Sequence, residues 1–271
     1  MNIQIIGIHG APRSGTSWVG EIFNSSPQTA YRYQPLFAYA FRDRIDVDSD
    51  AAEVRSWLDD LLHTRDEFVL QTGAARLARR GTQFTKTSTT HLVYKEVRFH
   101  HLIEHLLDAI PGARYVGLIR DPRDVIASWS MAPREFDLAW SLDGEWRLAA
   151  HKNAGLGENW YGFERWKELA ELFLRLSEKY PNRFRLVRYE DLVLDPEPII
   201  RNLFSFCEID FKNQTKRFLA RSTSEDDSDP YGVFRNTSNR FQYKLPPHIA
   251  EAIVQELSDT PLAPFLDPAN H

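Results

Sequence analysis

The chain has 271 residues, of which 42% are hydrophobic, and its formal net charge at pH 7 is −5. This length suits one large α/β domain, and we expect residues 1–271 to form a single domain because no linker-like stretch divides them. A negative net charge is not typical of a nucleic-acid-binding or membrane-binding protein, so an anionic ligand must be held by a local cluster of donors. Cys207, the only cysteine, excludes an internal disulfide and a cysteine zinc site. Its apolar neighbours predict a buried thiol rather than a nucleophile.

The N-terminal segment does not have the pattern of a signal peptide. Residues 3–8 form a short, β-branched apolar run without a preceding basic region, which predicts a buried strand. No stretch of the chain approaches the roughly 18 continuous apolar residues of a membrane span. We therefore expect a soluble protein, located in the cytoplasm.

Apolar periodicity alternates between two kinds of segment along the chain. Strands are predicted at residues 3–8, 91–99, 115–119 and 184–188, and helices at 14–24, 50–63, 102–110, 160–176, 196–206 and 248–257, with a further helix opened by Asp121 and Pro122. The Ser- and Asp-rich residues 222–229 predict a mobile loop. This alternation predicts a three-layer α/β domain of the P-loop type, with a central parallel sheet flanked by helices. Ligands of such sheets bind at the carboxyl ends of the strands.

A loop of the phosphate-binding type follows the first predicted strand. Gly10 and Gly15 have the GxxxxG spacing between a strand and a helix. An anion can be held there by backbone N–H groups, by the Arg13 guanidinium and by the hydroxyls of Ser14, Thr16 and Ser17. Thr16 stands where a nucleotide kinase has the lysine that reaches a β/γ-phosphate beside magnesium. The pattern predicts a site for a smaller diphosphate-like group without a metal; a plain turn that contains an arginine is the alternative.

A second anion site is predicted after residues 115–119. Arg120 ends that strand, and Ser128 lies about two turns along the helix that Asp121 caps. Both side chains can point back toward the carboxyl end of the strand and clamp a separate phosphate. The alternatives are a salt bridge of Arg120 to Asp121 or Asp124, and a Ser128 hydroxyl that bonds to its own helical turn.

Five segments in chain order resemble the sulfotransferases that use 3′-phosphoadenosine 5′-phosphosulfate (PAPS). They are Pro12-Arg13-Ser14-Gly15-Thr16-Ser17-Trp18, Gly20-Glu21-Ile22-Phe23-Asn24 followed by Pro27 and Tyr33-Gln34-Pro35-Leu36, Val93-Tyr94-Lys95-Glu96-Val97-Arg98, residues 118–129, and Arg188-Tyr189-Glu190-Asp191-Leu192. The pattern is most similar to the Golgi carbohydrate 6-O-sulfotransferases, here without a membrane anchor. The resemblance implies that residues 12–18 bind the 5′-phosphosulfate, that Arg120 and Ser128 bind the 3′-phosphate, and that Tyr189 lies near the adenine. We further expect Arg235, Asn236 and Thr237 to close over the 3′-phosphate.

The electrostatic part of sulfuryl transfer is assigned to Arg13 and Lys95. Lys95 lies in the middle of a predicted strand, where a buried lysine is costly unless it meets an anion. The alternative partner is Glu96, but adjacent strand residues point to opposite faces of a sheet. We therefore favour Lys95 as a contact of the transferred sulfate.

The catalytic base is not fixed by the sequence. The resemblance implies a glutamate where this chain has Gln34, and a glutamine cannot accept a proton. We assign Gln34 and Arg98 to acceptor binding. Glu96 is the first candidate for the base and His9 the second, because a histidine has a suitable pKa. The two aspartates shortly after Gln34, Asp43 and Asp46, are further candidates.

The sequence therefore predicts a sulfotransferase that moves the sulfuryl group of PAPS to a hydroxyl of a small molecule or a glycan. Its product would be adenosine 3′,5′-bisphosphate (PAP), with no metal and no nucleic-acid partner. Acceptor specificity is assigned to residues 131–159, around which Trp129, Trp140, Trp146 and Trp160 gather. The alternatives are a P-loop nucleotide kinase or hydrolase, against which Thr16 counts, and a non-catalytic donor-binding relative, which Gln34 leaves open.

Overall fold

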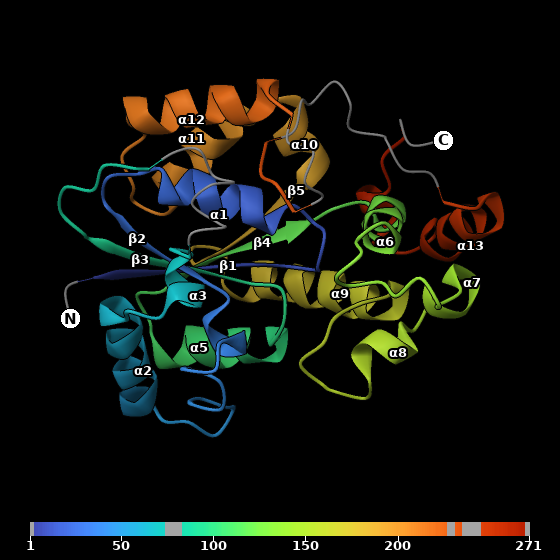
Figure 1. Cartoon of the computed structure of the whole chain (residues 1–271), viewed down its shortest axis with the longest axis horizontal. Helices are drawn as coiled ribbons and strands as arrows, with labels where there is room; N and C mark the ends of the chain where they lie inside the picture. Colours follow the sequence, from blue (N-terminus) through green and yellow to red (C-terminus); the bar gives the residue numbers. More distant parts are fainter. Residues whose placement is uncertain (1–2, 74–82, 227–230, 235–244, 269–271) are drawn as a thin grey trace.

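The carboxyl ends of five parallel strands form the edge on which the predicted ligand loops meet. The computed structural model describes residues 3–73, 83–226, 231–234 and 245–268. The strands are β1 (Gln4–Gly10), β2 (Thr29–Tyr33), β3 (His91–Glu96), β4 (Arg114–Ile119) and β5 (Phe184–Arg188), in the order β2-β3-β1-β4-β5 (Figure 1). Every strand pair is parallel. The predicted α/β class with a central parallel sheet is confirmed.

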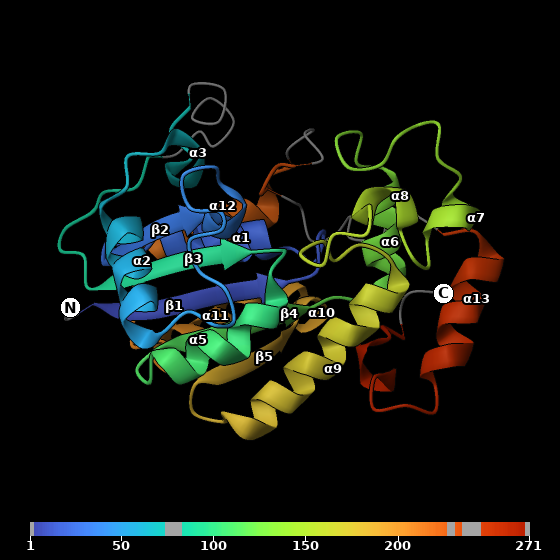
Figure 2. The ribbon, with the colours of Figure 1, turned by 90° about the horizontal axis from the view of Figure 1, so that it is seen from below.

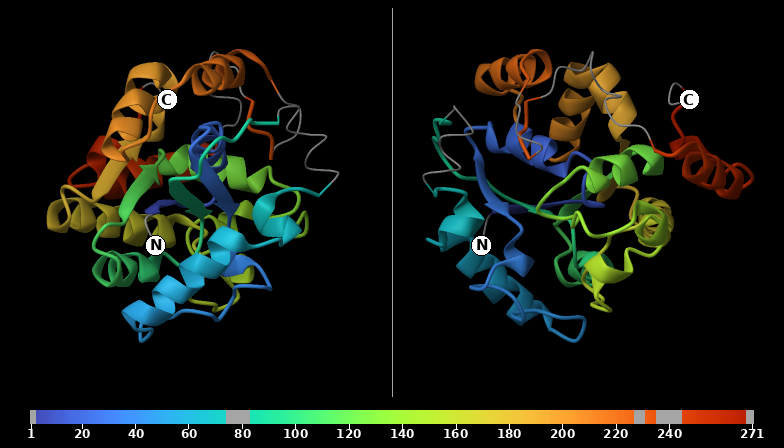
Figure 3. Two further views of the ribbon diagram at one scale, coloured as in Figure 1. Left: turned by 90° about the vertical axis from the view of Figure 1, so that its left-hand side faces the viewer. Right: turned by 45° about the vertical axis from the view of Figure 1, so that its right-hand side comes forward.

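Helices cover both faces of the sheet. One face packs on α1 (Thr16–Asn24), α10 (Tyr189–Leu194), α11 (Pro196–Phe206) and α12 (Asn213–Ser224), and the other on α2 (Ala51–His63), α5 (Ile103–Ala109) and α9 (Phe163–Lys179). Figure 3 shows α2 and α12 on opposite sides of the strands. Alternation along β1 divides the two cores, because Ile5 packs in the α2–α9 core whereas Ile6 and Ile8 pack in the α1–α12 core. Cys207 is fully buried in the second of these cores, as predicted.

A smaller group of helices gathers beyond the carboxyl ends of the strands (Figure 2). It consists of α6 (Pro122–Ser130), α7 (Leu142–Glu145), α8 (Ala150–Asn153) and α13 (Pro247–Leu257). The remaining helical turns are α3 (Glu67–Leu70) and the 3-10 helices η1 (Pro35–Phe37), η2 (His100–Leu102) and η4 (Ala263–Phe265). Every helix among the described residues is too short or too polar to cross a bilayer.

Strand β2 and helix α12 are among the elements that the sequence did not predict. Strand β2 has only five residues and contains Arg32, whose guanidinium donates hydrogen bonds to the carbonyl oxygens that end α2. Helix α12 includes residues 222–224, so the expected mobile loop was wrong for those three residues. The reason is that the Ser222 hydroxyl is buried and accepts a hydrogen bond of 2.9 Å from Trp18 Nε1. Residues 227–229 of that predicted loop lie outside the described residues.

The predicted bounds of two other elements also shift. The helix expected from residue 160 begins at Phe163, because Gly162 precedes it with a φ of 85°. The strand expected over residues 91–99 ends at Glu96.

Gly117 in β4 allows α9 to pack closely on the sheet. A Cβ atom added at this position would lie 2.7 Å from the rings of both Phe173 and Phe184. Gly112, two residues before β4, offers a matched control, since an added Cβ there meets no atom within 4 Å.

We expect Gly117→Ala to lower the free energy of unfolding by about 1–3 kcal/mol, because two rigid rings must move to admit the methyl group. Urea denaturation of the parent, Gly117→Ala and Gly112→Ala measures this. Equal losses of unfolding free energy in the two variants would show that the close packing of α9 does not depend on the absence of a side chain at Gly117.

Candidate active site

The loop between β1 and α1 needs both of its glycines. Gly10 ends β1 beside Leu118, whose carbonyl oxygen would lie 2.7 Å from an added Cβ. Gly15 has a φ of 88°, and a Cβ there would lie 2.5 Å from the Tyr189 ring. The loop is therefore a narrow turn whose backbone can approach a ligand closely.

Ser14 in this loop carries a polar group that the protein leaves unused. Its side chain is fully buried, and its hydroxyl has no hydrogen-bond partner among the described residues. A buried hydroxyl without a partner is unfavourable, so such a group points to a bound ligand that supplies the missing contact. Thr16 is also buried, while Ser17 opens onto a neighbouring cavity.

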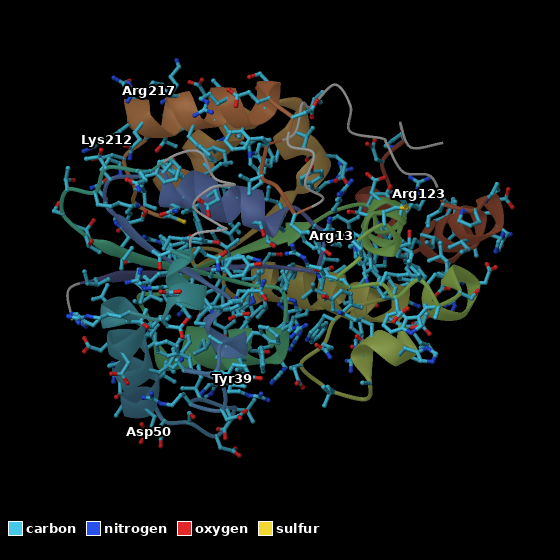
Figure 4. The ribbon with its side chains drawn as sticks, in the orientation of Figure 1. Arg13, Tyr39, Asp50, Arg123, Lys212 and Arg217 are labelled. Carbon is cyan, nitrogen blue, oxygen red and sulfur yellow. The ribbon has the colours of Figure 1, made fainter. Side chains whose placement is uncertain are left out.

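The structure brings the two predicted anion sites together. Arg13 Nε donates a hydrogen bond of 3.2 Å to Ser128 Oγ, and an Arg120 guanidinium nitrogen donates one of 3.2 Å to the Arg13 carbonyl oxygen. Figure 4 places Arg13 at the end of the sheet beside α6. The Arg120 guanidinium also stacks 4.7 Å from the centre of the Tyr189 ring. Four of the predicted donor-site residues thus form one connected cluster.

Arg120 also makes the ion pair that was considered as an alternative role. It contacts Asp124 at 3.2 Å, while its buried Nε has no hydrogen-bond partner among the described residues. Ser128 Oγ accepts a hydrogen bond from Arg13, and among the described residues its hydroxyl is not seen to donate to a carbonyl oxygen of its own turn. Trp18, the last residue of the first motif, lies 6.3 Å from the Tyr189 ring, so two aromatic rings flank the cluster.

The N-terminus of α6 is anchored by buried carboxylates. Asp121 accepts a hydrogen bond from the Arg123 backbone N–H at 2.8 Å and from the Arg123 side chain. The Asp121 backbone N–H donates to Glu190 Oε1 at 2.8 Å, which ties the end of β4 to the residues after β5. Burial raises the pKa of Glu190 to about 7.

Lys95 and Glu96 lie on opposite faces of the sheet, as strand alternation requires. Both side chains are fully buried. Lys95 lies on the α1 face, with Nζ 4.3 Å from the centre of the Tyr33 ring and no salt-bridge partner among the described residues. Glu96 lies on the α2 face, where its Oε1 accepts a hydrogen bond of 2.8 Å from the Leu36 N–H. The alternative of a Lys95–Glu96 ion pair is therefore not observed.

Glu96 and His9, the two candidate bases, are enclosed on that α2 face. Burial raises the pKa of Glu96 to about 8, against the lowering effects of the Leu36 N–H, Lys95 and Arg98. His9 Nδ1 lies 3.1 Å from His100 Nδ1, and burial lowers the pKa of His9 to about 3. The carboxyl group thus keeps its proton at neutral pH, and the imidazole is neutral and weakly basic. Both assignments stay predictions.

A cavity of about 420 Å³ adjoins the donor cluster. It is lined by Ser17, Glu21, Tyr31, Tyr33, Gln34, Phe37, Phe68, Gln71, Val97, Arg98, Arg134, Glu135, Lys152, Tyr161, Tyr231, Gly232 and Val233. The predicted acceptor residues Gln34 and Arg98 are among them. Gln34 has a φ of 42°, and the Arg98 guanidinium stacks 4.0 Å from the centre of the Phe37 ring.

Several lining residues were missed because no sequence motif marks them. Arg134, Glu135 and Lys152 fall in the segment assigned to acceptor specificity, but nothing in their local pattern separates them from ordinary surface charges. Among the described residues, the cavity is lined by tyrosines and phenylalanines instead of the four tryptophans that were considered. Asp43 and Asp46 are exposed and do not line it. Arg235, Asn236 and Thr237 lie outside the described residues.

Comparison with known proteins identifies the family. A model of the sulfotransferase family matches residues 6–213. The chain belongs to the sulfotransferase family.

Relatives of this sulfotransferase include carbohydrate sulfotransferases. Carbohydrate sulfotransferase 3 of Mus musculus is 30% identical over 174 residues, which cover 60% of this chain and 36% of the relative. Carbohydrate sulfotransferase 6 of Homo sapiens is 27% identical over 264 residues, which cover 78% of this chain and 65% of the relative. The chain thus spans between about a third and two thirds of the length of these relatives.

Solved structures share the fold of this sulfotransferase. Mouse sulfotransferase SULT7A1 complexed with PAP has a TM-score of 0.58 at 12% identity, covering 97% of this chain and 87% of that one. Retinol dehydratase in complex with androsterone and PAP has a TM-score of 0.55 at 17% identity, covering 95% and 82%. At these identities the likeness concerns the fold alone.

We expect Glu190 to make the stability of this sulfotransferase depend on pH. Its pKa is about 7 in the folded state against an ordinary 4.5, so the folded state holds more protons between these values and stability falls as pH rises through them. A glutamine stays neutral and can still accept from the Asp121 N–H. The Glu190→Gln variant should therefore gain stability relative to the parent as pH rises across this window.

Urea denaturation at several pH values measures this difference. Glu171→Gln is the control, because Glu171 is exposed on α9. A difference in the free energy of unfolding between the parent and Glu190→Gln that stays constant across this pH range would contradict the expectation.

Proposed function

We propose that this protein transfers the sulfuryl group of PAPS to an acceptor hydroxyl, and that the acceptor is a carbohydrate or a small molecule. The observation that carries the proposal is the connected cluster of Arg13, Ser128 and Arg120 beside the unused Ser14 hydroxyl. It offers two sets of anion donors at one edge of the sheet, as a nucleotide with phosphates at both 5′ and 3′ positions requires.

The residues of the cluster fit the parts of PAPS in a defined way. The loop of residues 12–17 would hold the 5′-phosphosulfate, with the Ser14 hydroxyl and the loop N–H groups as donors. Arg120 and Ser128 would hold the 3′-phosphate, and the Tyr189 and Trp18 rings would flank the adenine. When bound, PAPS supplies the sulfuryl group itself.

Lys95 would stabilise the charge that develops on the transferred group. Its ammonium is buried, lies on the same face of the sheet as α1, and contacts an aromatic face rather than a carboxylate. A fixed positive charge in a dry site acts more strongly on an anion than it would in water. No metal is invoked in this mechanism.

The acceptor would occupy the cavity that Gln34 and Arg98 line. Its walls combine aromatic rings with amide, hydroxyl and cationic groups, which suits a sugar ring. The carbohydrate sulfotransferases among the relatives support this class of acceptor. A single domain over residues 1–271, a cytoplasmic location and the absence of a metal requirement stay predictions.

We expect PAP to bind more tightly than ATP with magnesium. Arg120→Ala should raise the Kd for PAP by roughly tenfold or more, since charge-assisted hydrogen bonds contribute about 1.5–3 kcal/mol. Isothermal titration calorimetry measures the Kd values for PAP and for ATP with magnesium. Arg201→Ala is the control, because Arg201 is exposed on α11 and pairs with Glu197. A preference for ATP with magnesium would favour the kinase or hydrolase instead.

We expect Lys95→Met to lower kcat by roughly 100-fold while PAP affinity changes little, because the lost charge acts mainly on the transferring group. Transfer from radiolabelled PAPS to oligosaccharides that end in N-acetylglucosamine, N-acetylgalactosamine or galactose measures kcat. A parent that binds PAP but shows no turnover with this panel and with simple alcohols would instead favour the non-catalytic relative.

A further inference from the structure

The acceptor cavity contains carboxylates that the sequence did not single out as bases. Glu96 and His9 are enclosed on the sheet face opposite to Lys95. Two other carboxylates, Glu21 and Glu135, line the cavity itself. A base must lie within hydrogen-bond reach of the hydroxyl that it deprotonates, so these two are better placed.

Glu135 is held in position by α6, the helix that carries Ser128. Its backbone N–H donates to the Ala132 carbonyl oxygen at 2.9 Å, and its carbonyl oxygen accepts from Trp129 Nε1 at 3.2 Å. The next residue, Phe136, packs with its ring centre 5.0 Å from that of Trp129. The backbone at Glu135 is thus fixed relative to the donor cluster.

The carboxylate of Glu135 has an oxygen that the protein does not use. Oε2 is buried and has no hydrogen-bond partner among the described residues. Cations from three segments nevertheless line the same cavity. They are Arg98, which follows β3, Arg134, which directly precedes Glu135 in the sequence, and Lys152 of α8. They place positive charge around the cavity without occupying the Oε2 atom of Glu135.

Two tyrosines connect Glu135 with the donor loop. The Tyr231 hydroxyl accepts a hydrogen bond of 2.8 Å from the Arg134 N–H, and its ring centre lies 5.2 Å from the Arg13 guanidinium. Burial is the largest cause of the raised pKa of Tyr161 and of Tyr231; the Glu135 charge adds to both shifts and the Arg13 charge opposes both. The charges of Arg13 and Glu135 therefore both act on these two tyrosines, with opposite effects on their pKa values.

Glu21 is the less suitable of the two cavity carboxylates. It lies on α1, is almost fully buried, and its Oε2 accepts a hydrogen bond of 3.0 Å from Asn24 Nδ2. A proton transfer to Glu21 would have to compete with contacts that are already made.

We propose that Glu135 is the base that takes the proton of the acceptor hydroxyl. The inference rests on the proposed sulfotransferase function. Glu135 Oε2 receives the proton while the acceptor oxygen forms its bond to sulfur. At the same time the bond between sulfur and the 5′-phosphate oxygen breaks, and its electron pair leaves on PAP. Glu135 then gives the proton to water and is ready for the next turnover.

The test is the pH profile of kcat for the parent, Glu135→Gln, Glu21→Gln and the control Glu171→Gln, with the oligosaccharide of the panel that the parent sulfates best. We expect Glu135→Gln to lower kcat by roughly 100-fold or more and to remove the fall in kcat at low pH. Its Kd for PAP should stay within a few-fold of the parent value. Glu171→Gln should have the kcat and the pH profile of the parent, and Glu21→Gln should keep the fall in kcat at low pH.

A second measurement does not depend on turnover. A water-soluble carbodiimide with glycine amide should label Glu135 of the parent protein, and the oligosaccharide should slow this labelling, which peptide mass spectrometry follows. If Glu135→Gln fails to fold, Glu135→Asp replaces it, with a reduced kcat and a retained acidic limb as the expected result.

The outcomes separate the base from the proposed function. A parent without transfer activity contradicts the proposed function. An active parent with a normal profile in Glu135→Gln, or with the acidic limb lost in Glu21→Gln instead, overturns the role of Glu135. Glu135 that the oligosaccharide does not protect from carbodiimide would also contradict it.

Discussion

The contact between Arg120 and the Arg13 carbonyl joins the two halves of the candidate active site. The two halves follow different strands of the sheet, since Arg13 comes after β1 and Arg120 comes after β4. Because β1 and β4 are hydrogen-bonded neighbours, their loops leave the sheet side by side. The Arg120 guanidinium is shared among the Arg13 carbonyl, Asp124 and the Tyr189 ring. One side chain thereby sets the spacing of the donor loop, α6 and the residues after β5.

Strand alternation imposes the second constraint, because it separates groups that are adjacent in sequence. Lys95 must face α1 if it is to lie near the donor loop, and Glu96 must then face α2. His9 pairs in register with Glu96 and lies on that same face. A base that serves a group near Lys95 has to come from another part of the chain, and the carboxylates that line the cavity are those of Glu21 in α1 and Glu135 after α6.

The parts of the structure that could be predicted are those with local signals. The apolar runs of β1 and β4, the glycine spacing around Arg13 and the Asp121 cap of α6 each lie within a few neighbouring residues. Strand β2 is short and contains Arg32, whose guanidinium donates hydrogen bonds to carbonyl oxygens at the end of α2 and to that of Tyr31. The cavity was not predictable because it joins residues after β2, β3 and α6 with residues near position 231. Glu135 became notable only through an unpaired oxygen atom, which no sequence pattern encodes.

The distribution of charge explains how a carboxylate base could work beside an anionic donor. The whole chain is negative, with a net charge of −5, yet Arg13, Lys95 and Arg120 surround the predicted donor site. Three further cations, Arg98, Arg134 and Lys152, line the acceptor cavity. An ionised glutamate close to a sulfate would otherwise raise the energy of both groups. The donor-site cations can compensate the charge of the proposed donor, and the cations that line the cavity can compensate a negative charge on a glutamate there. The Tyr231 ring contacts both sets, because its centre lies 5.2 Å from the Arg13 guanidinium and 4.8 Å from the Arg134 guanidinium.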